Sequence, residues 1–272
     1  MMALANFARM EGAQARWLRA VGRFLPVVIA LALWEAVVDF GLVNRDFLPS
    51  FSETFAALWH MAQSGEIWLN LFVSLYRALI GLLIGSLLGL GIGLLMATSE
   101  RADRFFGPLV ATTYSLPKAS LVPLFILWFG IGDVTDIVTV VLACLLPVIV
   151  STYHGVKAVP PILIWSARAM GTPERALLWR VLFPASLGSI LTGVRIALSF
   201  CFVLTISAEM IAAKTGIGKL IFIYGENGAY AFMFGGLMAV VIVAYAADRA
   251  LVATMHHILR WDDTIHSVTA YD

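Results

Sequence analysis

Apolar runs long enough to cross a lipid bilayer dominate this chain, and they restrict its possible folds more than any other feature. A helix needs roughly 20 mostly apolar residues to span the hydrocarbon core. Six segments approach that requirement, at residues 24–43, 69–97, 109–131, 137–155, 190–213 and 231–255. Backbone groups in lipid must be satisfied within the protein. The sequence therefore predicts an all-α polytopic membrane protein with about six transmembrane helices in one domain, residues 24–255.

The composition agrees with a lipid-facing surface. Hydrophobic residues make up 61% of the 272 residues and charged residues only 13%, whereas a soluble domain carries about 25% charge. The formal net charge of +1 gives no bias toward a nucleic-acid partner. Membrane lipid is the partner that this composition favours.

The third and the first of the six segments are not simple apolar spans. The third is interrupted by polar residues and prolines, so we expect a broken or re-entrant helix there: Tyr114, Pro117, Lys118 and Pro123. The first follows several arginines, as a signal peptide would. However, its run is long, carries Glu35 and Asp39 near its far end, and is followed by no small-x-small cleavage pattern. We interpret it as a retained first helix.

The basic residues predict the orientation. With both termini in the cytoplasm, tails at 1–23 and 256–272 included, only Arg45, Lys214 and Lys219 fall in segments on the opposite side. The cytoplasmic side then holds Arg9, Arg16, Arg19, Arg23, Arg101, Arg104, Lys157, Arg168, Arg175, Arg180, Arg249 and Arg260. This distribution follows the positive-inside rule.

Glycines recur on one face of the second segment, at Gly81, Gly85, Gly89 and Gly93. Small residues at this spacing let helix backbones approach closely in lipid. We expect them to pack against another helix, either as a pivot or as static packing. Before this segment, Pro49 and Ser50 or Ser52 form a helix-start signal for a short amphipathic helix on the outer side.

Ionisable residues at membrane depth are candidates for a substrate path. Glu209 lies near the outer end of the fifth segment, where it could instead pair with Lys214 or Lys219 or cap a loop. Lys118, with Tyr114 nearby, lies in the broken third segment and could line a cavity, or could pair with Asp133 or Glu100. Arg77 and Arg195, near helix ends, could extend their charged groups to the interface instead of contacting substrate.

No motif for catalysis or metal binding is present. The nearest approach to a phosphate-binding loop, Gly216-Ile217-Gly218-Lys219-Leu220, has a misplaced first glycine and no hydroxyl for magnesium. The chain is thus expected to bind no cofactor or metal and to have no catalytic residue. Energy for transport would come from an ion gradient or from another subunit.

A polar, arginine-bearing island at residues 165–184 separates two apolar segments and falls on the cytoplasmic side. It resembles the EAA loop of binding-protein-dependent ABC importer permeases, whose pattern is Glu-Ala-Ala, three residues, Gly, nine residues, Ile-x-Leu-Pro. The matching residues are Ala167, Gly171, Val181 and Pro184. The departures are Trp165 for the glutamate, Ser166 for the first alanine and Phe183 for the leucine. Glu174 or Arg168 could replace the missing acidic contact.

Other stretches resemble the permeases for nitrate, taurine and aliphatic sulfonates. They include Leu121 to Gly132, LVPLFILWFGIG, and Ala208-Glu209-Met210 followed by Gly216-Ile217-Gly218. The resemblance implies a type I ABC importer permease in a bacterial inner membrane, commonly as two identical copies. It also implies a periplasmic or lipid-anchored binding protein, and two ATPase subunits that hold ATP and magnesium.

In such permeases the loop forms a short coupling helix seated in a groove of the ATPase. Here Thr172 and Pro173 can start that helix, since proline suits a first turn, and Pro184 is expected to limit it. The alternatives are an importer for a cofactor precursor or an aromatic acid, a gradient-driven secondary transporter, and a membrane scaffold without transport.

Overall fold

The computed structural model describes residues 25–260, and every regular element in that part of the chain is a helix. The first helix covers residues 25–39. After it come α2 (Phe51–Ser64), α3 (Glu66–Thr98), α4 (Glu100–Tyr114), a 3-10 turn (Lys118–Leu121), α5 (Val122–Phe129), α6 (Asp133–Lys157), α7 (Pro161–Ala169), α8 (Glu174–Leu177), a π-helical turn (Leu178–Leu182), α9 (Phe183–Ala212), α10 (Ile217–Glu226) and α11 (Tyr230–Ile258). The prediction of an all-α chain is confirmed. The predicted tails lie outside the described residues, except for residues 256–260.

Four helices in the described part of the chain are long and apolar enough to cross a membrane: Glu66–Thr98, Asp133–Lys157, Glu174–Ala212 and Tyr230–Ile258. They include nearly all of the segments predicted at 69–97, 137–155, 190–213 and 231–255. The helix over residues 25–39 falls within the predicted first span, and its beginning borders the undescribed residues.

The broken helix expected at 109–131 is confirmed, with bounds that differ from the predicted ones. α4 begins earlier, at Glu100, and the stretch Lys118–Phe129 bends away from it by 95°. The break coincides with Pro117, which has an extended backbone (φ −72°, ψ 96°). A proline disfavours helical geometry in the residue before it, so α4 ends before this point.

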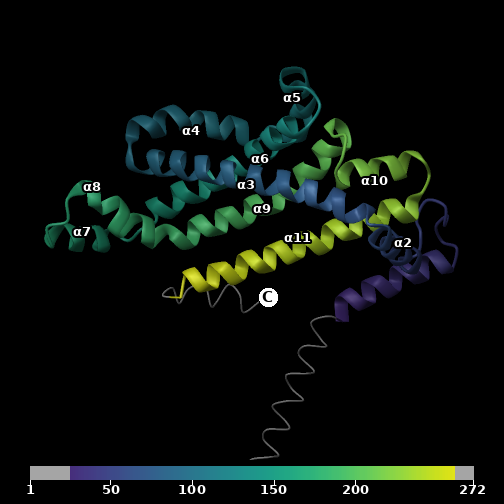
Figure 1. Ribbon diagram of the computed structural model, residues 1–272. Coiled ribbons are helices and arrows are strands. Elements are labelled where there is room, and N and C mark those ends of the chain that lie inside the picture. The colour runs from purple at the N-terminus through teal and green to yellow at the C-terminus, as the bar shows by residue number, and fades with distance from the viewer. Residues whose placement is uncertain (1–24, 261–272) are drawn as a thin grey trace, which may run out of the picture.

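Three long helices, α3, α6 and α9, run side by side through the middle of the molecule, with α4 and α11 on opposite sides of them (Figure 1). The predicted glycine face of α3 packs directly on α6. A Cβ atom on Gly85 would lie 2.8 Å from the Val141 carbonyl oxygen, and one on Gly93 would lie 2.7 Å from Thr152 Cβ. The close approach that the spacing predicted is confirmed.

The contact between α6 and α9 uses the same device in the half nearer α7. A Cβ atom on Gly155 of α6 would lie 2.6 Å from Ser189 Cβ, and one on Gly193 of α9 would lie 2.5 Å from Ser151 Cβ. Cys144 and Cys201 are buried free thiols in this core. The three central helices are therefore closely packed along much of their length.

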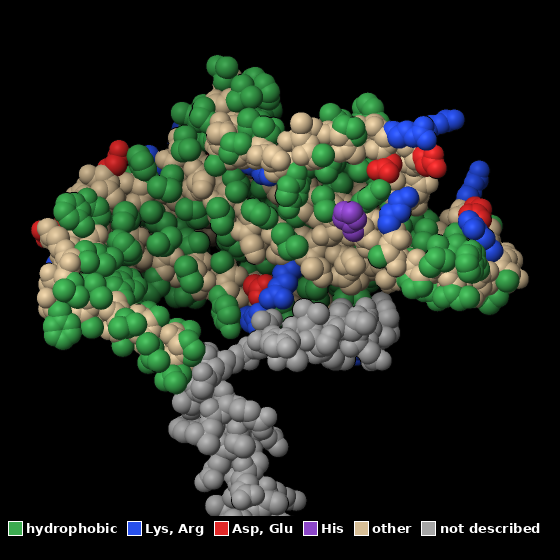
Figure 2. All heavy atoms as spheres, turned by 180° about the vertical axis from the view of Figure 1, so that it is seen from behind, with side chains coloured by type: hydrophobic (Ala, Val, Ile, Leu, Met, Phe, Trp, Pro, Cys, Tyr) green, Lys and Arg blue, Asp and Glu red, His purple; other side chains and the backbone are tan. Residues whose placement is uncertain are grey.

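The outside of the bundle is mostly apolar (Figure 2). α11 exposes Leu237, Val241, Ile242 and Tyr245, as expected of a helix in contact with lipid. Charged side chains on the face shown gather mainly at the end where α7 and α8 lie. The α4 helix differs from the others because it has no buried residue at all.

The predicted amphipathic helix is α2, which begins after Ser50. The Ser50 side chain accepts the backbone N–H of Glu53, while the Glu53 carboxylate accepts the backbone N–H of Ser50. These two bonds form a capping box, which satisfies backbone donors that a helix start leaves free. α2 packs against α11, where Gly235 faces Met61. It covers the end of the bundle opposite α7 and α8 (Figure 1).

Candidate functional site at the two ends of the bundle

The polar island folds as two helices joined by a tight turn. α7 ends in a Schellman motif, in which the Thr172 N–H donates to the Ala167 carbonyl (3.0 Å) and the Gly171 N–H donates to the Arg168 carbonyl (2.9 Å). Gly171 has φ +77°, a left-handed conformation that costs other residues about 1–2 kcal/mol. Ala167 and Gly171, which match the alanine and glycine of the loop pattern, therefore end α7 together and turn the chain.

An ion pair between Arg168 and Glu174 connects the two sides of this turn. The Arg168 Nε donates to Glu174 Oε1 at 2.7 Å, and Nη2 donates to Oε2 at 3.1 Å. The hydrogen bond to Glu174 raises the pKa of the Arg168 guanidinium. Both side chains are exposed, so the pair faces the space beyond the bundle. α8 begins at Glu174, as the Thr172-Pro173 signal predicted.

Pro184 does not end the helix that follows the turn, and this part of the prediction is wrong. Residues Glu174–Ala212 form one continuous span. A π-helical turn precedes the proline, with the Phe183 N–H donating to the Leu178 carbonyl, and Val181 lies half-buried within it. Pro184 then occupies the first turn of α9, where its missing N–H is tolerated. The coupling segment is thus joined directly to a transmembrane helix.

Large apolar side chains on this segment are exposed. Trp165, Met170 and Trp179 are 63%, 78% and 62% accessible. Behind them lies a hollow of about 750 Å³ between α7, α8 and the ends of α3 and α6. The segment therefore projects from the bundle and presents apolar groups outward.

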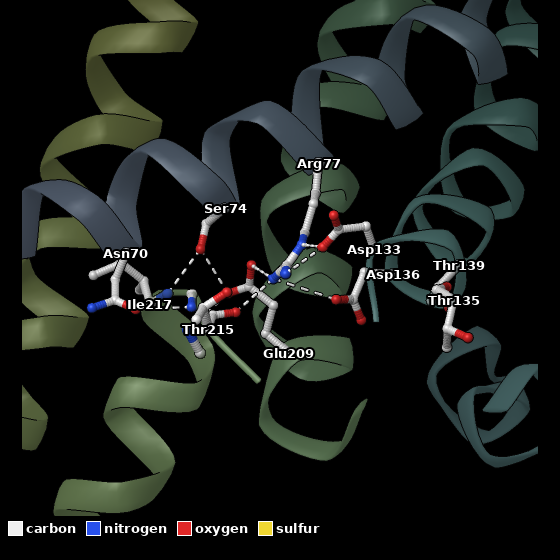
Figure 3. A network of polar contacts seen from close by, with 12 residues as sticks. Asn70, Ser74, Arg77, Asp133, Thr135, Asp136, Thr139, Glu209, Thr215 and Ile217 are labelled. Carbon is white, nitrogen blue, oxygen red and sulfur yellow. Dashed lines mark hydrogen bonds and ion pairs between the residues drawn. The ribbon is translucent and has the colours of Figure 1, made fainter. Parts of the chain in front are cut away.

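At the opposite end, Arg77 occupies the centre of a buried polar network (Figure 3). Although we expected it to reach the interface, it is only 2% exposed. Its Nε and Nη2 donate to Asp133 Oδ1 at 2.9 and 2.6 Å, and its Nη1 donates to Glu209 Oε1 at 2.9 Å and to the Thr215 carbonyl at 2.7 Å. Arg77 thus connects α3 with α6, with α9 and with the loop before α10.

Glu209 is fully buried. Its carboxylate pairs with Arg77, which replaces the predicted partners Lys214 and Lys219. Oε2 also accepts the Ser74 hydroxyl at 2.7 Å and the Gly218 N–H at 2.9 Å. In this conformation Glu209 fixes the ends of three helices and lines no open path.

Two aspartates one turn apart on α6 complete the network. Asp133 is largely exposed, with 59% of its side chain accessible, whereas Asp136 is fully buried and lies 3.4 Å from Arg77 Nη1. Asp133 was considered above only as a partner for Lys118, and Asp136 was not considered. A signal was present: Arg77, in the middle of an apolar run, requires a countercharge, and these aspartates open the next clear span.

Tyr114 and Lys118 lie beside a different hollow. About 380 Å³ of space separates α4 from α6, lined by Tyr114 and Ser115 together with Asp103, Tyr153 and His154. Lys118 Nζ donates to the Tyr114 carbonyl at 3.1 Å and lies over the Tyr114 ring. It pairs with neither expected carboxylate, since Asp133 binds Arg77 and Glu100 binds Arg104. Arg195 pairs with Asp248 of α11.

The sequence profile described as "Binding-protein-dependent transport system inner membrane component" matches residues 81–260 of this chain, most of its length. This chain belongs to that family. The permease is 35% identical over 257 residues to SsuC, an aliphatic sulfonates transport permease protein of Escherichia coli (strain K12). That match covers 92% of this chain and 95% of SsuC.

Two further comparisons agree. TauC, the taurine transport system permease protein of Escherichia coli (strain K12), is 29% identical over 240 residues, covering 86% of this permease and 87% of TauC. Among solved structures, an inward-facing MetNI methionine ABC transporter matches with a TM-score of 0.61 and 20% identity. This match covers 69% of this permease and 93% of that chain, and it supports the type I importer permease fold.

The protein is therefore a multi-pass membrane permease subunit of an ABC importer, and it is not itself an enzyme. Its family implies ATPase subunits and a substrate-binding protein as partners. Within residues 25–260, no group of three or more His, Cys, Asp or Glu side chains is placed to hold a metal ion. The two ends of the bundle, one exposed and one buried, are the permease's candidate functional sites.

Proposed function

We propose that this permease carries a small anionic solute, a sulfonate such as taurine or an alkanesulfonate, from a binding protein into the cytoplasm of a bacterium. The observation that carries this proposal is the similarity along nearly the whole chain to proteins named for aliphatic sulfonates and for taurine. Nitrate and other small anions belong to the same wider class. Transport proceeds by alternating access, driven by ATP and magnesium bound on two partner ATPases, while this chain binds neither.

The orientation is part of the proposal. Both termini and the α7–α8 segment face the cytoplasm, and the Arg77 network faces the outside. Support comes from the basic residues of the α7–α8 end, which include Arg101, Lys157 and Arg175. The membrane is then the bacterial inner membrane, and the binding protein approaches the end formed by α2 and α10.

A second copy of the chain completes the path. α4 has no buried residue, and the hollow beside it is lined by apolar side chains together with Asp103, Tyr153 and His154, which leaves α4 free to pack on another chain. We assign it to the boundary between two permease copies, with Tyr114 and Lys118 near the substrate path. A lysine there would attract an anion during passage.

The α7–α8 segment is the contact to the ATPase. Ala167, Gly171 and the Arg168–Glu174 pair shape its turn, while Val181 and Pro184 join it to α9, so that movement of the segment is transmitted along a continuous helix. Trp165 replaces the usual acidic contact with an exposed indole. Tryptophan is enriched among residues that dominate binding energy at interfaces, so this contact is apolar in the present permease.

Transport is tested in proteoliposomes that contain the permease with its ATPase, supplied with its binding protein. We expect radiolabelled taurine or ethanesulfonate to accumulate only with ATP and the binding protein together. Accumulation driven by an ion gradient without ATP would overturn the proposal. Binding of riboflavin or an aromatic acid by the binding protein, with no sulfonate binding, would move the substrate class but keep the importer.

The coupling contact is tested by Trp165→Glu, with Trp128→Ala on α5 as a control that removes a similarly exposed indole. We expect Trp165→Glu to lose the ATPase during purification and to abolish ATP-driven uptake, while the permease itself remains folded. The control should retain the ATPase. If Trp165→Glu retained ATPase and uptake, the apolar contact would be disproved. Gly171→Asp, which alters the turn instead of the contact, should likewise weaken uptake.

A further inference from the structure

The two N–H groups on Nη1 of Arg77 do not suffice for the three acceptors around them, which belong to Glu209, Thr215 and Asp136. A guanidinium has five N–H groups, two of them on Nη1. Glu209 and the Thr215 carbonyl together occupy Nη1, while Asp133 takes Nε and Nη2. Asp136 faces the same Nη1, at 3.4 Å, and cannot receive a hydrogen bond from it unless one of the present acceptors leaves.

Asp136 has no other donor in this conformation. Both of its carboxylate oxygens are buried without a hydrogen-bond partner. The neighbouring hydroxyls of Thr135 and Thr139 donate to backbone carbonyls. Buried carboxylates normally have hydrogen-bond partners, because leaving one without donors is costly. Asp136 is therefore an acceptor that the present arrangement leaves unused.

Glu209 is in the opposite position, because it does not depend on Arg77 alone. Its Oε2 holds the Ser74 hydroxyl and the Gly218 N–H. If Nη1 moved from Glu209 to Asp136 while the end of α9 left α3, Glu209 would also lose the Ser74 hydroxyl of α3 but keep the Gly218 N–H, and Asp136 would gain one donor. The network therefore has two possible arrangements, one with Nη1 on Glu209 and one with Nη1 on Asp136, and Arg77 can change between them by a short movement.

The packing indicates which elements would separate. α3 and α6 are in close contact through the glycines from Gly81 to Gly93, so Arg77 and Asp136 remain together. α9 is held to α6 most closely near Gly155 and Gly193, in the half toward α7. The other end of α9, which carries Glu209, is linked to α3 by the polar network, and the Cys201 thiol farther along α9 donates to the Ala78 carbonyl. Bending about the close contact would move this end and the loop at Thr215 away from Arg77.

We propose that Asp136 is the second binding position of Arg77, occupied when the outer end of the permease opens. In the open state Nη1 leaves Glu209 and Thr215 and donates to Asp136, which keeps α3 and α6 joined while the end of α9 is released. Asp136 is then a positioning residue of the transport cycle. This inference rests on the proposed function, since it requires an outer end that opens with ATP.

The test measures the separation of α6 and α9 in the full complex. Spin labels are placed at Ile131→Cys and Lys214→Cys, both exposed positions at the outer end, while the native cysteines are buried. Distances are recorded by pulsed electron paramagnetic resonance at rest and after trapping with ATP and vanadate. Asp136→Asn is compared with the wild type and with Asp46→Asn, a control at an exposed outer acid.

We expect trapping to produce a longer distance in the wild type and in Asp46→Asn. In Asp136→Asn the open population should fall about ten-fold, because a hydrogen bond to a charged group is lost from that state alone. The resting distance and the melting temperature should not fall, since Asp136 accepts no hydrogen bond at rest. If Asp136 had only a structural role, Asp136→Asn would change the resting state as well. A smaller open population with an unchanged resting state therefore distinguishes the proposed role.

Two results would overturn this inference without affecting the proposed function. In the first, Asp136→Asn opens as fully as the wild type, which would mean that Asp136 stays neutral throughout. In the second, Asp136→Asn lowers the melting temperature and broadens the resting distance, which would make Asp136 part of the resting structure. If the wild-type labels did not respond to ATP and vanadate, and ATP drove no uptake, the proposed function would fail and this inference with it.

Discussion

Arginine forms an ion pair at each end of this permease, in opposite surroundings. At the end opposite α7 and α8, Arg77 is 2% exposed and contacts carboxylates from α6 and α9. At the α7–α8 end Arg168 binds Glu174, and the two side chains are 51% and 69% exposed. The first arginine joins segments more than 50 residues apart, whereas the second closes a turn within six residues.

The difference indicates what each end does. A buried charge network stabilises the protein only when all of its hydrogen bonds and ion pairs are formed. Such a network therefore suits an end that must hold one conformation and then change to another. An exposed pair contributes little stability but leaves its groups accessible to a partner. We therefore expect the Arg77 end to control a conformation and the α7–α8 end to present a surface.

The largest expected effect of a single change is that of Arg77→Ala. Removing the guanidinium leaves Glu209 and Asp136 buried without their countercharge, at a cost of about 3–5 kcal/mol. We expect a severe loss of expressed, folded permease, measured by fluorescence-detected size exclusion after heating. Arg77→Lys should be intermediate, because it keeps the charge but loses the planar fork. A fully stable Arg77→Ala would contradict the role of the network.

Two glycines with positive φ allow a matched comparison of the ends. A Cβ atom on Gly216 (φ +126°) would lie 2.5 Å from the Glu209 carboxylate, whereas one on Gly171 (φ +77°) would meet nothing within 4 Å. Gly171→Ala should therefore cost only the backbone strain, about 1–2 kcal/mol. Gly216→Ala should lower the melting temperature further, because it also displaces Glu209. Equal shifts for the two variants would show that the outer network tolerates displacement.

The smallest effect on stability is expected for Arg168→Ala. The pair that it breaks is exposed, so the melting temperature should not change measurably. Binding of the ATPase should weaken a few-fold, because the turn that presents Trp165 loses this ion pair. Co-purification and titration of the ATPase measure this change. A clear loss of thermal stability would mean that the α7–α8 segment is not independent of the bundle.

Local signals in the sequence predicted local structure well. The helix-start signal at Ser50 is confirmed by the beginning of α2, and the four glycines of α3 face α6 as their spacing indicated. The alanine and glycine of the loop end α7. In each case the atoms that interact are near in the chain or repeat with the period of a helix.

Expectations failed where distant groups decide. The alternatives that placed Arg77 at the interface and Glu209 beside Lys214 or Lys219 are both wrong, because a sequence shows only neighbours along the chain. Pro184 was expected to end a helix, but the π-helical turn before it allows the helix to continue. That turn depends on how the segment packs and is not encoded in any short pattern.

Hydropathy and spacing determined by themselves that this chain is a helical membrane protein, that α3 has a close-packing face, and where the α7–α8 turn lies. The physical reason is that lipid requires apolar runs and that a helix repeats every 3.6 residues. Only the tertiary structure decided which carboxylates surround Arg77, and that Asp136 is left without a donor. The pairing of these charged groups matters because they are buried. They become buried only when α3, α6 and α9 pack together.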